Sequence, residues 1–230
     1  MPRLQRVFAL VLSLFLSPWA LKAEPVATLI SLEGTVQVAA GFSLQAADLG
    51  QLFSAGDRLS TQDASSAHLV LPDGSSLILA ANTELMLKAL GATGAILQVR
   101  QGLIDFVGNP GASLDLQTPS ASLSAQGADF EVAVDAGSTQ VTVNEGQLTL
   151  SDPAHKRSIP VQALEQARLF GGRLERANAL GKRDIDDFRE RWQRAHLIHP
   201  QRFELLKSFK SQEKTERKKL KLRRAKAALP

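Results

Sequence analysis

Alternation of apolar and polar residues with a period of two is the strongest pattern in this chain. Phe130, Val132 and Val134, for example, alternate with polar or small residues. Because successive side chains of an extended strand point to opposite faces, this period gives a strand one buried and one solvated face. The same pattern recurs through residues 26–150, so this part of the chain is predicted to be β throughout.

Short turn signals separate the predicted strands at uneven spacing. Many short strands divided in this way are typical of a sandwich, a barrel or a short solenoid, and the pattern alone leaves these open. The fold is therefore predicted to be mainly β, a solenoid- or sandwich-like stack of short strands. The turn signals are Glu33-Gly34, Asp73-Gly74, Gly91 with Gly94, residues 108–111, Ala136-Gly137 and Glu145-Gly146.

The pattern becomes helical after residue 180. Ile185, Phe188, Trp192 and Ala195 fall at helical spacing and form one apolar stripe, with Asp184 as the predicted cap. We expect this stripe to pack against the β body, because an isolated helix of this length is marginal in water. A second helix is predicted after Pro200, with Phe203, Leu206 and Phe209 on one side.

The first residues predict export. Arg3 and Arg6 precede an apolar run over residues 7–16, and Ala23 is a small residue at the expected cleavage point. This order is typical of a secretory signal peptide, so residues 1–23 are set apart from the fold. An uncleaved anchor is the alternative, but a spanning helix needs about 20 apolar residues. We expect the mature chain to be periplasmic or secreted.

Charge divides the mature chain into an acidic body and a basic tail. Residues 24–154 contain three basic and fourteen acidic residues, a net charge of −11, whereas residues 155–230 have a net charge of +12. Such a tail is predicted to bind anionic lipid, lipopolysaccharide or a wall polymer, not nucleic acid, if the chain is exported. A solubilising tail and one folded back on the body are the alternatives. The predicted contacts are Lys214, Arg217, Lys218, Lys219, Lys221, Arg223, Arg224 and Lys226.

The organisation that follows from these patterns has four parts. A signal peptide precedes a β domain, which closes at Gly171-Gly172 after a last strand or two in residues 158–170. A linker with amphipathic helices and a frayed basic tail complete the chain. The predicted boundaries are residues 1–23, 24–170, 171–209 and 210–230.

Several stretches of the body, in their order and spacing, resemble the FecR family of exported bacterial domains. The resemblance covers about residues 30–150. One position departs from it: the family favours Arg-Gly-Thr where this chain has Gln126-Gly127-Ala128. The matching stretches are residues 34–38, 52–61, 67–77, 97–102, 116–121, 127–132 and 141–146.

The resemblance implies an all-β domain that acts outside the cytoplasm in interaction or sensing. In well-known members, a sigma-factor-binding segment and a membrane helix precede this domain. We expect neither here, and we do not carry the sigma-regulating role over. The motif residues have structural explanations as turns, bulges and core positions. They are Gly56, Asp57, Thr61, Asp73, Gly74, Gly102, Thr118, Pro119, Gly127, Phe130 and Gly146.

Signals for catalysis and cofactors are weak. The chain has no Cys, which excludes disulfides, thiolate metal sites and a cysteine nucleophile. No phosphate-binding or nucleophile-elbow motif occurs, and His196 and His199 are a poor metal pair because no third ligand is placed beside them. The sequence therefore predicts a non-enzymatic module without cofactor or metal that binds an envelope protein. The alternative is a structural envelope protein tethered by its tail.

Overall fold

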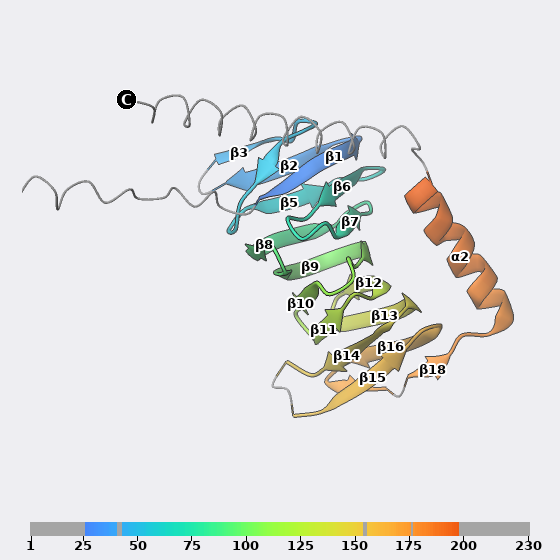
Figure 1. Cartoon of the computed structure of the whole chain (residues 1–230). Coiled ribbons are helices and arrows are strands. Elements are labelled where there is room, and N and C mark those ends of the chain that lie inside the picture. Colours follow the sequence, from blue (N-terminus) through green and yellow to red (C-terminus); the bar gives the residue numbers. More distant parts are fainter. Residues whose placement is uncertain (1–25, 41–42, 154–155, 176, 198–230) are drawn as a thin grey trace, which may run out of the picture.

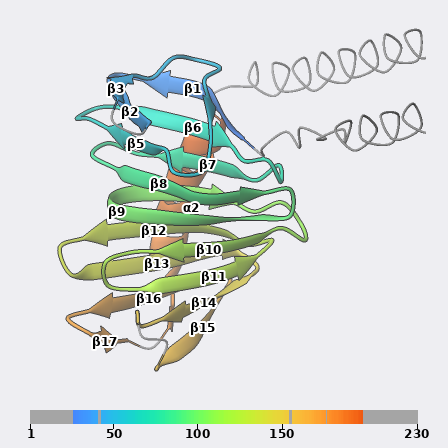
Figure 2. The same ribbon diagram turned by 90° about the vertical axis from the view of Figure 1, so that its left-hand side faces the viewer.

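The structure is a computed structural model, and two β-sheets make up its body (Figure 1). Sheet A and sheet B pack face to face, and their strands run across the long axis of the stack (Figure 2). The residues described are 26–40, 43–153, 156–175 and 177–197. The predicted signal peptide, second helix and basic tail lie outside them.

Sheet A is antiparallel throughout. Its order begins at the N-terminal end of the stack, and both final strands pair with β16. The strands are β4 (Leu52–Phe53), β1 (Ala27–Glu33), β6 (Ser66–Val70), β7 (Ser76–Leu79), the second half of β9 (Gly94–Val107), β12 (Asp129–Asp135), β13 (Ser138–Glu145), β16 (Glu165–Phe170), then β17 (Arg173–Leu174) and β18 (Asn178–Ala179).

Sheet B lies alongside sheet A, and its strand order also begins at the N-terminal end of the stack. All its pairings are antiparallel except that of β9 with β10. The order is β3 (Ser43–Ala46), β2 (Val36–Ala40), β5 (Arg58–Thr61), β8 (Glu84–Gly91), the first half of β9, β10 (Ser113–Gln117), β11 (Ser122–Gln126), β14 (Gln147–Ser151) and β15 (Ser158–Gln162).

The hydrophobic core lies between the two sheets and is continuous along the stack. Phe130, Val132 and Val134 are buried, while the residues between them are half-exposed, as the period of two predicts. The Phe106 and Phe130 rings pack with centroids 5.3 Å apart. The chain crosses repeatedly between the sheets as it advances. The fold is thus a sandwich in section and solenoid-like along its axis, which confirms the predicted stack of short strands.

Gly102 marks the point where β9 passes from sheet B to sheet A. The sequence predicted a turn or bulge before a new strand here, but the strand continues in the other sheet. Gly102 has a φ of +102°, and a Cβ on it would lie 2.4 Å from the Thr83 Cα. The Thr83 Oγ1 accepts a hydrogen bond from the Leu103 N–H at 3.1 Å, so this side chain satisfies a backbone donor at the bend.

The β body extends beyond the predicted boundary at residue 170. Gly171 and Gly172 have φ values of +52° and +74°, so they form a tight turn between β16 and β17. Two successive residues with positive φ are what a two-residue hairpin requires, and glycine adopts them without steric cost. The glycine pair therefore continues the β structure, which ends at Ala179, instead of closing it.

Helix α2 (Lys182–Leu197) lies over the outer face of sheet A in both views (Figures 1 and 2). It begins before the predicted cap: the Gly181 carbonyl accepts the Ile185 N–H at 2.9 Å, and Asp184 lies in the first turn. Phe188 is 2% exposed and lies outside the inter-sheet core, so it is buried between α2 and the body. Ile185 is half-buried.

The side chains of Trp192 and Ala195, also predicted to pack, lie outside the described part. Within the residues described, the structure contains no helix with the length and apolar character that crossing a membrane requires.

Candidate functional site

The outer face of sheet A is occupied by α2. A row of mostly polar residues crosses this face in register, from His68 through Ile78, Asp105 and Glu131 to Thr142. Asp105 and Thr142 point away from the core, yet they are only 8% and 4% exposed. A covering element explains their burial, so α2 shields this part of the face from a partner.

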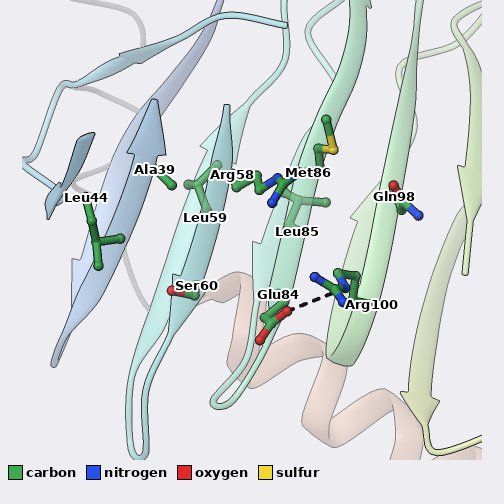
Figure 3. Close-up of a pocket in the computed structure, with 10 residues that line it drawn as sticks. All are labelled: Ala39, Leu44, Arg58, Leu59, Ser60, Glu84, Leu85, Met86, Gln98 and Arg100. Atoms are coloured by element: carbon green, nitrogen blue, oxygen red, sulfur yellow. Dashed lines mark ion pairs between the residues drawn. The ribbon is translucent and has the colours of Figure 1, made fainter. Parts of the chain in front are cut away.

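The outer face of sheet B is open along the stack, and no described element lies over it (Figure 2). Its first strands place Leu44, Ala39, Arg58, Met86 and Gln98 side by side in one register row. These residues line a hollow of about 440 Å³ (Figure 3). Ala39 and Met86 are the neighbours of Arg58 in this row, and Leu44 lies beyond Ala39, so the hollow combines a cation with apolar surface.

An ion pair bounds the other side of this hollow. The Arg100 Nε lies 3.9 Å from the Glu84 Oε2, and both side chains are substantially exposed (Figure 3). Exposed pairs of this kind contribute little to stability, about 0–1 kcal/mol. The charged groups are therefore available to a partner at small cost to the fold.

The three basic residues of segment 24–154 all lie on the outer face of sheet B. They are Arg58, Lys88 and Arg100, each on the solvent side of its strand. Among the described strand residues, the same face has two carboxylates, Glu84 and Asp115, so it carries one net positive charge. The segment as a whole has a net charge of −11. The cations are thus concentrated on one face of an acidic domain.

A second hollow, of about 230 Å³, continues the open face toward β14. Its lining includes the small polar residues Ser122, Ser124 and Ser151 together with apolar Ile96. The Lys88 Nζ donates to the Gln117 Oε1 at 2.7 Å between the two hollows. Together the two hollows define the sheet B face as the candidate interaction surface.

The motif residues Gly56 and Asp57 form a turn before β5. Gly56 has a φ of +98°, and the Asp57 carboxylate accepts the Ser54 N–H at 2.9 Å. The Gly56 N–H donates to the Leu87 carbonyl at 2.6 Å, which ties the turn to β8. These two residues shape the chain next to Arg58 but do not line the hollow.

Asp73 and Gly74 form the turn between β6 and β7. The Asp73 carboxylate accepts the Ser75 N–H at 2.7 Å, and Gly74 has a φ of +89°. The Asn109 side-chain amide donates to the Asp73 carbonyl at 2.7 Å, and the Asn109 N–H donates to the Ser75 hydroxyl at 3.0 Å. This turn and the loop of residues 108–111 therefore stabilise each other.

Two buried threonines tie strands together. The Thr61 hydroxyl donates to the Ala80 carbonyl at 2.5 Å and accepts the Thr83 N–H at 2.9 Å. The Thr118 hydroxyl accepts the Ala121 N–H at 2.8 Å across the turn that contains Pro119. Both groups close turns and are buried away from the open face.

The remaining motif residues are one core phenylalanine and two glycines with positive φ. Phe130 is fully buried in the core. Gly127 and Gly146 have positive φ, and a Cβ on Gly146 would lie 3.1 Å from the Ala128 Cα. None of the motif residues lines either of the two hollows.

The acidity of Asp129, at the start of β12, is perturbed. Burial raises its pKa above the ordinary value of 3.8, and a hydrogen bond from the Gly108 N–H opposes this in part. The nearby Glu145 carboxylate raises the pKa further, because two like charges disfavour ionisation. Asp129 pairs in register with Val107 and Glu145 in sheet A, so it is not part of the sheet B face.

Among the residues described, no cluster of three potential metal ligands occurs. His68, on β6, has its Nε2 2.5 Å from the Ser76 Oγ. His155 and His199 lie outside the described residues.

Sequence reasoning did not single out Leu44, Met86, Arg58 or Arg100 as a site. The signal was available in part, because basic residues are rare in segment 24–154 and each of these side chains falls on the polar side of its strand. Which strands are neighbours could not be read from the pattern.

The structure thus defines a two-sheet β stack with one covered and one open face. Residues 57–149, from β5 to β14, match the family model described as FecR protein. This match agrees with the FecR resemblance that the motifs predict. No protein of curated function matches the chain.

Two crystal structures, at 1.65 and 2.50 Å resolution, match the chain in a structural comparison. Both are of a candidate anti-sigma factor from Parabacteroides distasonis ATCC 8503. The sequence identities are 18% and 17%, and the TM-score is 0.48 for each. The matches cover 57% of this chain and 63% of the length of that protein.

Proposed function

We propose that this chain is an exported, non-enzymatic interaction or sensing module that binds an envelope protein on the outer face of sheet B. The observation that carries the proposal is the contrast between the two faces. Sheet A is covered by α2, whereas sheet B presents an open face with a cation set between apolar side chains. Export is supported by the signal-peptide pattern of residues 1–23.

The chemistry of this face suits a protein partner. Arginine and methionine are enriched in protein interfaces. Methionine supplies apolar contact there, and arginine supplies directional hydrogen bonds. The positive face on an acidic domain favours a partner segment that is acidic and partly apolar. The remaining negative surface repels the same segment and so orients the encounter. We infer that partner binding at Arg58 and Met86 is the signal that this domain transmits.

The lining of the main hollow supports the non-enzymatic assignment. Its titratable groups are Arg58, Glu84 and Arg100, and two of them form an ion pair. Ser60 lies there without a histidine or lysine among the lining residues to activate it. This arrangement favours recognition of a surface over a reaction.

The test compares two single charge reversals. The chain from residue 24 to 230 is used as bait in a periplasmic extract, as wild type and as Arg58→Glu. We expect Arg58→Glu to lower capture of the enriched partner about tenfold, because the partner's acidic group then faces a carboxylate. The matched control is Arg173→Glu, since Arg173 is also an exposed arginine on a short strand, at the far end of sheet A.

Equal capture by Arg58→Glu, Arg173→Glu and the wild type would exclude the sheet B face as the binding surface. A bait that ends at residue 206 separates the second candidate, a structural protein tethered by its tail. That bait keeps partner capture if the domain binds the partner and loses it if the tail does.

A further inference from the structure

The two ends of sheet B differ in whether a further strand can pair with them. β3 is the terminal strand at one end and β15 is the terminal strand at the other (Figure 2). In a terminal strand, every second residue directs its backbone N–H and C=O away from the neighbouring strand, and these groups are a template for pairing. The state of these groups therefore decides which end can associate.

The outer edge of β3 keeps its backbone donors and acceptors. The Ala47 N–H donates to the Val36 carbonyl at 2.9 Å, next to the register pairs of β3 and β2. Because hydrogen-bonded and non-hydrogen-bonded pairs alternate in an antiparallel ladder, Gln45 bonds to β2, whereas Leu44 and Ala46 direct their backbone groups outward. Among the strands described, β3 pairs with β2 alone, so this edge is open.

The pairing on the other side of β2 agrees with this assignment. The Gln62 N–H donates to the Thr35 carbonyl at 3.1 Å, next to the register pairs of β2 and β5. The odd-numbered residues of β2 therefore bond to β5 and the even-numbered ones to β3.

The side chains of β3 do not oppose pairing. Its four residues, Ser43–Ala46, are all exposed, and none is charged or a proline. Proteins commonly block an edge with lysine or another charge, with proline or with a bulge. β3 has no such residue, and its short length limits the strength of pairing without preventing it.

The edge of β15, in contrast, is protected. The Asp152 N–H donates to the Arg157 carbonyl at 3.0 Å, so Pro160 and Gln162 in the same ladder face away from β14. Proline has no N–H to donate. The Gln162 N–H is already bound by the Glu165 carboxylate at 2.8 Å. Two successive outward positions of β15 thus lack a free donor.

We propose that two copies of the chain pair through β3, antiparallel and around a two-fold axis, so that sheet B continues from one copy into the other. Because one end of sheet B is open and the other is protected, the open edge meets itself, and a closed dimer forms instead of a fibre. The register that uses every outward group places Leu44 opposite Ala46 of the second copy and Gln45 opposite its own equivalent.

Charge permits this dimer, and the pairing enlarges the candidate interaction surface. Residues 24–154 carry −11 and residues 155–230 carry +12, so the copies have a net charge of only +1 each. Leu44 lines the main hollow on the outer face of sheet B, so the hollows of the two copies come to lie on one continuous sheet. The proposal does not depend on what binds there.

An extended segment of another protein is the competing occupant of this edge. The second copy is the better match, because its edge is equally short, uncharged and open. The two-fold arrangement also leaves no outward backbone group of Leu44 or Ala46 unpaired.

The first test measures mass against concentration by sedimentation equilibrium, with the chain from residue 24 to 230. Salt at about 0.3 M screens attraction between the acidic body and the basic tail of different copies. Small interfaces are weak, so we expect a monomer at about 1 μM and a growing dimer fraction toward about 1 mM.

Two substitutions at one position show whether the edge makes the contact. Ala46→Pro removes an outward N–H and should weaken the dimer about tenfold or more. Ala46→Val is the matched control, since it is similar in size to proline, keeps the N–H and should dimerise as the wild type does. Circular dichroism verifies the β signal of both variants. Ala46→Lys, which places a charge on the same edge, should also weaken the dimer and serves if Ala46→Pro does not fold.

The second test examines the register with a disulfide. Residues directly opposed in a non-hydrogen-bonded pair have Cα atoms about 4.5 Å apart, a distance that a disulfide can bridge. The chain has no cysteine, so Gln45→Cys can cross-link only to its equivalent in another copy. We expect it to form a covalent dimer under mild oxidation about tenfold faster than Gln162→Cys, an exposed position on β15.

Three results would overturn the proposal. A mass that stays monomeric at about 1 mM excludes the dimer. Equal cross-linking rates at positions 45 and 162 exclude the register, and a dimer that persists in folded Ala46→Pro or Ala46→Lys uses another surface. None of these measurements involves capture of an envelope protein, so this proposal and the proposed function fail separately.

Discussion

Gly102 shows how one residue lets a strand serve both sheets. Its φ of +102° is in the region that favours glycine, and a Cβ would meet the Thr83 backbone at 2.4 Å. We expect Gly102→Ala to lower the free energy of unfolding by about 2–5 kcal/mol, from backbone strain and overpacking together. Urea denaturation followed by circular dichroism measures the loss.

The control for this change is Gly137→Ala. Gly137 also has a positive φ, of +73°, but a Cβ added there would have no atom within 4 Å outside its chain neighbours. It should therefore show the backbone strain alone, about 1–2 kcal/mol. Equal losses for the two variants would mean that contact with Thr83 does not limit position 102.

Asp129 makes stability depend on pH. Since its pKa is raised in the folded protein, the native state binds more protons than the unfolded state between pH 3.8 and the higher native value. The contribution of Asp129 to stability therefore falls as pH rises through that window. Asp129→Asn keeps an acceptor for the Gly108 N–H and removes the charge, so we expect the variant to gain stability relative to wild type as pH rises.

Urea denaturation of both proteins at several pH values between about 3 and 7 measures this difference. Asp115→Asn is the control, because Asp115 is exposed on the sheet B face. An Asp129→Asn variant whose difference from wild type does not change with pH would contradict the assignment.

Helix α2 is attached to sheet A through Phe188. The side chain is 2% exposed, and a helix of 16 residues is marginal alone in water. We expect Phe188→Ser to cost about 1.5–3 kcal/mol of stability and to expose α2 to proteolysis. Limited proteolysis with mass spectrometry locates the cuts.

The neighbouring Arg189→Ser is the matched control, because Arg189 is exposed. Its effect should stay within about 0.5 kcal/mol. Unchanged protection of α2 in Phe188→Ser would show that other contacts hold the helix on the sheet.

The whole molecule presents two different faces. Helix α2 lies over the outer face of sheet A, whereas the outer face of sheet B is open and bears the cations of an acidic domain. A partner that approaches the stack therefore meets different chemistry on its two sides.

The sequence alone was sufficient for the fold class, the core side of the central strands and the resemblance to the FecR family. These follow from local rules: a period of two specifies which side of a strand is buried, and Gly in a turn specifies a backbone that other residues resist. The helix around Phe188 was also predicted, although it begins at Lys182, before the expected cap.

The tertiary structure alone decided where the faces are. Arg58, Met86 and Leu44 lie on separate strands that the fold brings together only because the chain crosses between two sheets, and no local pattern encodes that pairing. By sequence alone, Gly171 and Gly172 could either end a domain or form a hairpin turn. The pairing of β17 with β16 shows that they form a turn. Strand pairing depends on contacts between residues distant in sequence, which is why the open face appears only in the folded molecule.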